Sequence, residues 1–427
     1  MSHQHQYHLQ TTLLLLGLPP KSFVGIDLAS FNSTDRFQGI KYIPPGLHFV
    51  YFSPQGDMSL RSGFWFKAAD AGQHSVIITK YDAASEKLLE ESDMGVDEVL
   101  RIRANLAQLY GESLTVYRQP AKDGKEGSTR PDAEQWEALS EHIDEALLLR
   151  CLGTGLKCSS VSSSKMDRDK EEEKLMELLK GDDVVAEIEW TPVDLKRTWP
   201  EDAIGRDRTI MAKDRSWALG DIVGKLGISG GDGEKQMLGE IQLAFLMAVT
   251  LGCYSAMEQW RRLLGLTLTC KTAIFGEQKE FFEKLMEVLL TQMEYVDEVF
   301  LAQFVGGGEG EDSWLAKLLR GFGKGLAEII DDDAEQGNGK AKVRKSDTLE
   351  QYKEIESLVM KKFDWALDVK DVVRRGMVQT EEGEMVELEM VGLEEDDESG
   401  EYAPVIVEEY IEGDSAEVEM TPVPWPQ

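Results

Sequence analysis

The stretch Leu47-His48-Phe49-Val50-Tyr51-Phe52-Ser53 follows Pro44-Pro45-Gly46 and precedes a turn-rich segment at residues 54–57. Aromatic and β-branched residues of this kind favour strands. The stretch lacks a regular polar alternation, which indicates a strand buried on both faces. Similar runs of strand length occur at Leu9–Leu18, Gly63–Lys67 and Ser75–Tyr81. Residues 1–155 are therefore predicted to form a β-rich, sandwich-like domain.

Two helical stretches are predicted within this domain. Residues 88–109 carry Val96, Leu100 and Arg103 at helical spacing. Residues 133–152 place four apolar residues on one helical stripe, namely Trp136, Leu139, Ile143 and Leu147. Pro131-Asp132 lies immediately before this second stretch and is a typical helix start.

The chain becomes helical after Trp199-Pro200. Five helices are predicted from the apolar spacing: 236–251, a second one from Ala256 through Leu268, 280–304, 313–330 and 347–373. The segments 306–308 and 331–344 are predicted to be surface loops. Helices of this length with short connections indicate a bundle or superhelix. Residues 190–377 are thus predicted to form an all-helical domain, and the fold class is predicted to be α+β.

A linker is predicted between the two domains, at residues 156–189. It contains the serine-rich run Ser159-Ser160-Val161-Ser162-Ser163-Ser164, followed by a densely charged segment at 167–174. A polar stretch followed by mixed charge is typical of a flexible hinge. Phosphorylation of these serines is an alternative role.

The C-terminal segment 378–427 is predicted to be a disordered acidic tail. Residues 381–427 carry 17 Asp and Glu and no Lys or Arg, and such a segment repels itself. One apolar run, Ala403-Pro404-Val405-Ile406-Val407, has strand character, with Val405 and Val407 on one face. Pro404, Val405, Ile406 and Val407 are therefore candidate partner-binding residues that add a strand to the sheet edge of another protein. The alternative is a solvating tail in which the valines have no role.

Composition limits the function classes. The net charge of −33 over 427 residues repels phosphate backbones, so direct nucleic-acid binding is not expected and basic proteins are the expected partners. The four cysteines show neither a disulfide framework nor zinc-site spacing, which indicates a reducing compartment, the cytosol or nucleus. The apolar run at 12–18 is too short for a membrane span and has no basic segment before it.

The residues that could carry chemistry do not form a catalytic pattern. Of the six histidines, His3, His5 and His8 cluster at the N-terminus, and His48 lies in a predicted strand, where a core histidine is the ordinary interpretation. Three glycine-rich segments, 227–233, 306–310 and 321–325, lack the sequence context of a phosphate loop. We therefore expect no enzyme activity, no cofactor and no metal site.

A short basic patch precedes one candidate modification site. Lys340, Lys342, Arg344 and Lys345 lie in a predicted loop, and Ser346 follows them directly. The patch is a solvated loop or a nuclear localisation signal. A kinase that recognises upstream basic residues would make Ser346 a phosphosite.

Several blocks of sequence resemble one known family, the a1-cistron splicing factor family. The first runs from Leu16 to Val50 and includes Gly25-Ile26-Asp27, Gly39, and Pro44-Pro45-Gly46 with His48. The second is Thr191-Pro192-Val193 with Lys196-Arg197 and Trp199-Pro200. The third consists of residues 238–245, which include Gly239, Glu240, Gln242 and Phe245, together with Glu258-Gln259-Trp260. Each block also has a structural interpretation, as turns, strand entries and a packed helix.

The resemblance implies a fold and a function. Members of this family are assembly factors of the U5 small nuclear ribonucleoprotein, with a β-rich N-terminal domain and a helical domain similar to VHS domains. It implies binding to the largest scaffold protein of that particle, at its RNase H-like and Jab/MPN-like domains, which the tail bridges by strand addition. Occupancy would delay helicase loading until phosphorylation triggers release. The implied protein is a non-enzymatic, monomeric chaperone of the nucleus and cytoplasm.

Two other function classes remain open at this stage. One is an acidic adaptor whose VHS-like helical domain binds peptide motifs in another pathway. The other is a hydrolase or transferase with an unrecognised site. The long serine-rich linker and the extended loop at 331–346 depart from the family pattern and leave the regulatory site without a position.

Overall fold

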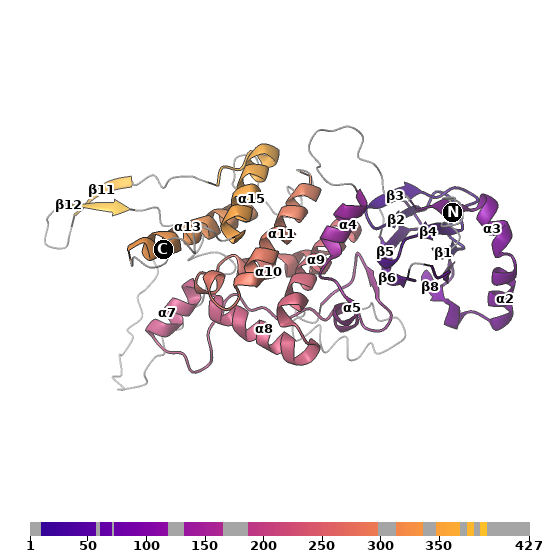
Figure 1. The fold of residues 1–427 in the computed structure, drawn as a ribbon, viewed down its shortest axis with the longest axis horizontal. Helices are drawn as coiled ribbons and strands as arrows, with labels where there is room; N and C mark the ends of the chain where they lie inside the picture. Colours follow the sequence, from indigo (N-terminus) through magenta and orange to yellow (C-terminus); the bar gives the residue numbers. More distant parts are fainter. Residues whose placement is uncertain are drawn as a thin grey trace, which may run out of the picture.

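The computed structural model describes residues 10–56, 60–70, 72–117, 132–164, 187–297, 313–335, 347–367, 374–379 and 385–390. Strands occupy one end of the molecule, helices fill the middle, and a small hairpin lies at the opposite end (Figure 1). The predicted α+β class is confirmed, since a β-sheet region precedes a helical one. Within these residues, no helix is long and apolar enough to cross a membrane.

The N-terminal part contains two five-stranded sheets. Sheet A has the order β8-β7-β1-β4-β9, and sheet B has the order β10-β6-β5-β2-β3. Most neighbouring strands are antiparallel, but β1 pairs with β7, and β4 with β9, in parallel. The strands are β1 (Thr11–Leu16), β2 (Phe23–Ile26), β3 (Ala29–Asn32), β4 (Gly39–Ile43), β5 (Gly46–Ser53), β6 (Ser62–Ala68), β7 (Val76–Asp82), β8 (Lys87–Glu90), β9 (Leu114–Val116) and β10 (Lys157–Ser159).

Both sheets are covered on both faces, as the apolar runs predicted. Leu13 and Leu15 of β1 belong to the same buried cluster as Val50 and Phe52 of β5, so this cluster fills the space between the sheets. Leu14 instead packs with the helices α2 (Val96–Ala104) and α3 (Leu106–Glu112). Successive side chains of a strand point to opposite faces, which explains why these strands show no polar alternation.

The outer face of sheet B packs against the helical part. Phe49 and Tyr51 of β5 and Trp65 of β6 belong to the core cluster of the helices. Trp65 stacks on Trp136 of α4 (Asp132–Ser140), with ring centroids 5.9 Å apart. The Trp136 indole N–H donates to the Leu47 carbonyl oxygen at 3.0 Å. Helix α4 lies within the predicted N-terminal domain and packs in turn against α9. The two predicted domains therefore share one hydrophobic core.

Two helix predictions in this region were partly wrong. Residues 87–90 form β8, a 3₁₀ turn follows at Glu91–Asp93, and the helix begins only at Val96. Residues 133–152 form two helices, α4 and α5 (Glu145–Leu152), because Asp144 caps α5 by accepting from the Leu147 amide. The apolar residues Trp136, Ile143 and Leu147 are all buried. Their regular spacing therefore indicated one continuous helix and concealed the break.

The helical part is built around α9. Residues along almost the whole length of α9 are buried, and α9 contacts α8, α10 and α11 as well as α4 and α5. The break predicted at Gly252 is confirmed, because Gly252 ends α9 in the left-handed conformation. The helices are α7 (Arg206–Lys213), α8 (Ser216–Gly230), α9 (Gly233–Leu251), α10 (Tyr254–Thr267), α11 (Lys279–Tyr295), α13 (Trp314–Glu335) and α15 (Asp347–Phe363), with a 3₁₀ turn at Thr272–Phe275.

Three predicted helix ends differ from the structure. The helix expected over 280–304 ends at Tyr295, where Val296 becomes extended, and residues 298–312 lie outside the described part. The helix expected to reach Val373 ends at Phe363, before Asp364 with its positive φ of 58°. Helix α13 continues to Glu335, so the loop predicted from residue 331 begins later.

The described ends of the predicted linker belong to the folded protein. Residues 157–159 form β10, the edge strand of sheet B. The next residue, Ser160, exchanges backbone and hydroxyl hydrogen bonds with Arg61, and its hydroxyl donates to the Leu251 carbonyl oxygen at 2.8 Å. Arg61 in turn donates to the Thr250 carbonyl oxygen at 2.8 Å. We call Arg61, Ser160, Thr250 and Leu251 the junction, and it replaces the expected flexible hinge here.

A hairpin crosses the boundary predicted between the helical domain and the tail, at residues 377 and 378. Strands β11 (Arg374–Gln379) and β12 (Met385–Met390) pair in antiparallel register. Residues 374–379 and 385–390 are thus strands, where a helical segment up to 377 and a disordered tail from 378 were expected. Met385 to Met390 alternates apolar residues with Glu387 and Glu389, a strand pattern that the acidic composition obscured. Residues 391–427 lie outside the described part.

The shared core predicts that the N-terminal domain does not fold alone. A fragment of residues 1–155 lacks β10 and exposes the faces of α4 and α5 that pack against α9, so we expect it to aggregate or to melt without a cooperative transition. The intact chain should unfold in one calorimetric transition. A fragment of residues 1–164 restores β10 but not α9, and should also aggregate. A soluble 1–155 fragment with a cooperative transition would contradict the shared core.

Candidate functional site

Asp27, predicted from the first motif block, is the centre of a buried polar cluster. It is fully buried at the turn between β2 and β3, with a positive φ of 53°. One carboxylate oxygen accepts from the Phe49 amide at 2.9 Å. The other accepts from His48 at 2.7 Å and from the Tyr117 hydroxyl at 2.6 Å. Because Tyr117 follows β9 of sheet A, this carboxylate links the two sheets.

His48 completes the cluster from β5. Its Nδ1 faces the Asp27 carboxylate, and its Nε2 lies 2.9 Å from the Pro44 carbonyl oxygen. Both ring nitrogens therefore have a hydrogen-bond partner inside the protein. Its exposed fraction is 3%, which leaves no room for a substrate. The interpretation of His48 as a core histidine is therefore confirmed.

The other residues of the first block shape strands around this cluster. Gly25 and Ile26 lie in β2, and a Cβ at Gly25 would lie 2.0 Å from the Tyr51 ring. Glycine is thus required where the Tyr51 ring covers β2. Gly39 and Gly46 start β4 and β5 with positive φ, and Pro44-Pro45 joins these strands.

Glu240 of α9 is the centre of a second buried cluster. Its carboxylate is fully buried and accepts from the Thr191 amide at 2.8 Å and from the Thr191 hydroxyl at 2.6 Å. It also accepts from Arg150 of α5 at 2.5 Å and from Gln259 of α10 at 2.8 Å. This arrangement raises the pKa of the Arg150 guanidinium. Burial opposes the rise, but the charge and hydrogen bond of Glu240, together with Cys151 and Asp144, outweigh it. The cluster joins three helices to the segment before the helical part.

Gly239 and Gln242 hold the connection between α4 and α5 against α9. A Cβ at Gly239 would lie 2.4 Å from the His142 carbonyl oxygen, so only glycine permits this approach. The Gln242 side chain accepts from the His142 amide at 2.8 Å and donates to the Ala138 carbonyl oxygen at 2.9 Å. Gln242 therefore supplies partners for the backbone exposed by the break between the two helices.

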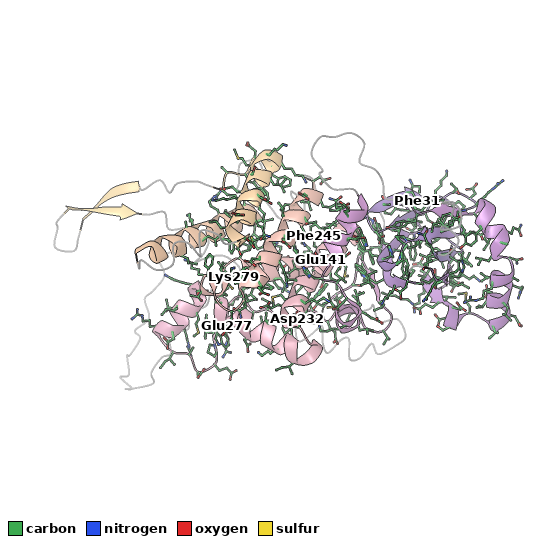
Figure 2. The ribbon with its side chains drawn as sticks, in the orientation of Figure 1. Phe31, Glu141, Asp232, Phe245, Glu277 and Lys279 are labelled. Atoms are coloured by element: carbon green, nitrogen blue, oxygen red, sulfur yellow. The ribbon has the colours of Figure 1, made fainter. Side chains whose placement is uncertain are left out.

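Phe245 and Trp260 belong to the same helical core. Phe245 is fully buried and is labelled within the helices in Figure 2. Its ring centroid lies 5.8 Å from that of Trp260. The Trp260 indole donates to the Gln292 side chain of α11 at 3.0 Å. Both positions of this block are therefore buried between helices.

The described part of the chain contains no catalytic arrangement that we can identify. Burial raises the pKa of the Cys151, Cys158 and Cys270 thiols, which makes them poor nucleophiles. No group of three metal-ligating side chains occurs among the described residues. A shallow depression beside α2 is lined mainly by Leu16, Gln38, Glu98, Arg101, Ile102, Asn105 and Leu109, which include no nucleophile paired with a base.

Sequence reasoning missed several partners of these clusters. No local pattern singled out Tyr117 or Arg150, since each acts across 90 residues of chain. Thr191 and Gln259 were quoted within motif blocks but received no role. Glu240 itself lies among apolar residues of a helix, and a charge in that position indicates a buried partner.

The structure does not describe the candidate interaction residues of the tail. Pro404, Val405, Ile406 and Val407, and the candidate phosphosite Ser346, lie outside the described residues. The described motif residues stabilise the fold.

Replacement of Glu240 by Gln should destabilise the helical part. The new amide group would place a donor against the donors of Thr191, Arg150 and Gln259, and the buried guanidinium would lose its counter-charge. We expect unfolding free energy to fall by about 2–3 kcal/mol, measured by urea denaturation. Glu234→Gln, in the first turn of the same helix, is the matched control and should change stability by less than about 0.5 kcal/mol. Equal effects of the two changes would contradict the role of the Glu240 cluster.

Comparison with known proteins agrees with both parts of this fold. Residues 9–153 match the model of the AAR2 N-terminal domain, and residues 190–368 match the AAR2 C-terminal repeat region. The AAR2 homolog of Caenorhabditis elegans is 26% identical over 349 residues, covering 74% of this chain and 86% of the relative. The human AAR2 homolog is 25% identical over 340 residues, covering 73% and 81%.

A relative named as a splicing factor is similar over a comparable span. The A1 cistron-splicing factor AAR2 of Saccharomyces cerevisiae is 26% identical over 306 residues, covering 68% of this chain and 78% of the relative. The matches span both the sheets and the helices, including the blocks that carry the Asp27 and Glu240 clusters. The chain belongs to the AAR2 family of splicing factor homologues.

Proposed function

We propose that this protein is a non-enzymatic assembly chaperone of the spliceosomal U5 small nuclear ribonucleoprotein. It would bind the largest scaffold protein of that particle, at the RNase H-like and Jab/MPN-like domains, and delay helicase loading during maturation. It would act as a monomer, in the cytoplasm and nucleus, and contact RNA only through its partner. The observation that carries this proposal is family membership over both parts of the chain, together with a yeast relative named as a splicing factor.

The geometry of the described residues supports a binding role. The polar clusters around Asp27 and Glu240 are buried and satisfied, so they stabilise the fold and do not face a substrate. The junction and the shared core join the sheets to the helices. Such a body can hold two regions of a partner at a set separation, because its own parts do not move independently.

The tail motif is the proposed contact. Pro404, Val405, Ile406 and Val407 would add a strand to the partner's sheet edge, with main-chain hydrogen bonds giving affinity and alternate side chains giving specificity. The acidic residues on either side of the motif would steer it towards a basic surface. Ser346 beside its basic patch remains the candidate site whose phosphorylation would release the partner.

Copurification tests the proposed function. The tagged chain, expressed in cells that assemble spliceosomes, should capture the U5 scaffold protein and U5 RNA, and nuclease treatment should leave the scaffold protein bound. Capture of neither would contradict the proposal. Loss of the scaffold protein after nuclease treatment would show that RNA mediates the contact, and would contradict direct binding.

Changes in the tail should weaken binding without unfolding the body. Val405→Asp and Val407→Asp would bury a charge, at a cost of a few kcal/mol, about 2–4, and Ile406→Pro would remove a main-chain donor. Deletion of residues 399–427 should weaken binding to the scaffold protein or separate its two domains. The melting temperature should not change, since the motif is not expected to contribute to the folded body.

Calorimetry for binding and thermal melting for stability, performed on the same variants, provide the measurement. Ser415→Asp, in the same tail but outside the motif, is the matched control and should bind as the unchanged chain does. Unchanged affinity after the deletion would contradict strand addition by this motif. Unfolding of the body after the deletion would contradict the independence of the tail.

A further inference from the structure

The small core between sheet A and the helices α2 and α3 is not closed at one end. Leu14 and Val99 at its centre are buried, whereas Leu16, Ile102 and Leu109 at its edge are only partly buried. These three edge residues line the shallow depression beside α2, together with Gln38, Glu98, Arg101 and Asn105. The depression therefore combines an apolar floor, which continues the core, with polar side chains around it.

Two of the polar lining residues have side chains that are available for a ligand. The backbone of each is fixed, because the Gln38 amide donates to the Ser113 carbonyl oxygen at 2.9 Å and the Asn105 amide donates to the Arg101 carbonyl oxygen at 3.1 Å. Among the described residues, neither the Gln38 nor the Asn105 carboxamide has a protein hydrogen-bond partner. Each carboxamide presents a donor and an acceptor, which is what a peptide group requires.

The charge available in the lining is positive. Glu98 is paired with Lys80 at 2.8 Å, and Arg103 on the same helix is paired with Glu91 at 2.8 Å. Arg101 has no ion pair with any residue in the described ranges. Its Nε donates to a backbone carbonyl oxygen of its own helix at 3.3 Å, which leaves the two outer nitrogens for another acceptor. A guanidinium group in this state binds a carboxylate through two hydrogen bonds.

The size of the depression limits the class of ligand. Its volume is about 220 Å³, below the range of about 300–1,000 Å³ for pockets that enclose a small molecule. It therefore fits part of a larger ligand better than a cofactor. The net charge of −33 repels phosphate groups, and the apolar floor favours an apolar side chain. These properties together select a segment of protein.

The chain's own tail is a poorer occupant than a segment of another protein. It contains apolar residues next to carboxylates, for example Leu393-Glu394. However, the tail follows β12, and Figure 1 shows β12 at the end of the molecule opposite α2 and α3. A tail segment would have to run the length of a body that is also net acidic and repels it. A partner segment with a single carboxylate avoids most of this repulsion.

We propose that the depression beside α2 is a docking site for an extended segment of another protein in which an apolar residue lies next to an aspartate or glutamate. The apolar side chain would pack on the leucines and the isoleucine of the floor, and the carboxylate would pair with Arg101. The carboxamides of Gln38 and Asn105 would bind the peptide groups. This site is separate from the tail motif and goes beyond the proposed function, because it does not depend on the identity of the scaffold protein.

A peptide probe tests the site directly. A capped six-residue peptide, with leucine next to aspartate and glycine or serine on either side, should bind the full-length chain. It should shift the backbone amide NMR signals of Gln38 and of residues 98–109. The same peptide with lysine in place of aspartate, or with glycine in place of leucine, should bind about fivefold more weakly or worse. Equal affinity of all three peptides would overturn the proposal.

A pair of arginine substitutions on α2 separates the site from net charge. Arg101→Ala should weaken binding of the leucine–aspartate peptide about fivefold or more, because the paired charge is lost. Arg103→Ala changes the net charge equally but removes only a surface ion pair outside the depression. It is the matched control, for which we expect unchanged affinity. Affinity comes from titration of the NMR signals, and thermal melting should show that both variants remain folded.

Other outcomes would overturn the proposal. Equal weakening by Arg103→Ala would show attraction to net charge only, and peptide-induced shifts confined to other residues would place the peptide elsewhere. Shifts of the same signals by a uridine oligonucleotide, without shifts by the peptide, would show a phosphate site. If deletion of residues 391–427 moves these signals in the absence of peptide, the chain's own tail is the occupant and the proposal is wrong.

Discussion

The contact between sheet B and the helices is the constraint on which the rest of the molecule depends. Trp65 lies between Phe49 and Trp136, at centroid distances of 5.0 and 5.9 Å, and the Trp136 indole is fixed to the backbone of β5. Aromatic pairs of this kind contribute beyond the area that they bury. Because β5 and β6 are covered on this face by helices, neither part can expose its own surface without loss of the common core.

The same contact explains why the motif residues of the family are buried. Asp27 holds β5 in place through the Phe49 amide and His48. Gln242 and Gly239 hold the connection between α4 and α5 against α9. Glu240 then ties α5 to α10. These residues form one path from the first sheet to the centre of the helices, so their role is to fix the relative position of the two parts.

The sequence was sufficient for the class of the fold and for most strands, because runs such as residues 49–52 are apolar at every position. It was not sufficient for features that depend on distant partners. The break at 141–144 contains no glycine or proline, and it is stabilised by Gln242, about 100 residues away. The serine run was predicted to be a hinge. It is ordered at Ser160 by hydrogen bonds with Arg61 and Leu251, which are distant in sequence. Asp27 and His48 were both quoted within the first motif block, but no local pattern indicated their contact with each other or with Tyr117.

The account assigns the described body to stability and the C-terminal residues to partner binding. Hydrogen exchange of the full-length chain, with and without the U5 scaffold protein, tests this division most directly. The partner should slow exchange at 403–407 and leave the junction around Arg61 and Ser160 unchanged. Protection confined to the helices, or faster exchange at the junction, would contradict it.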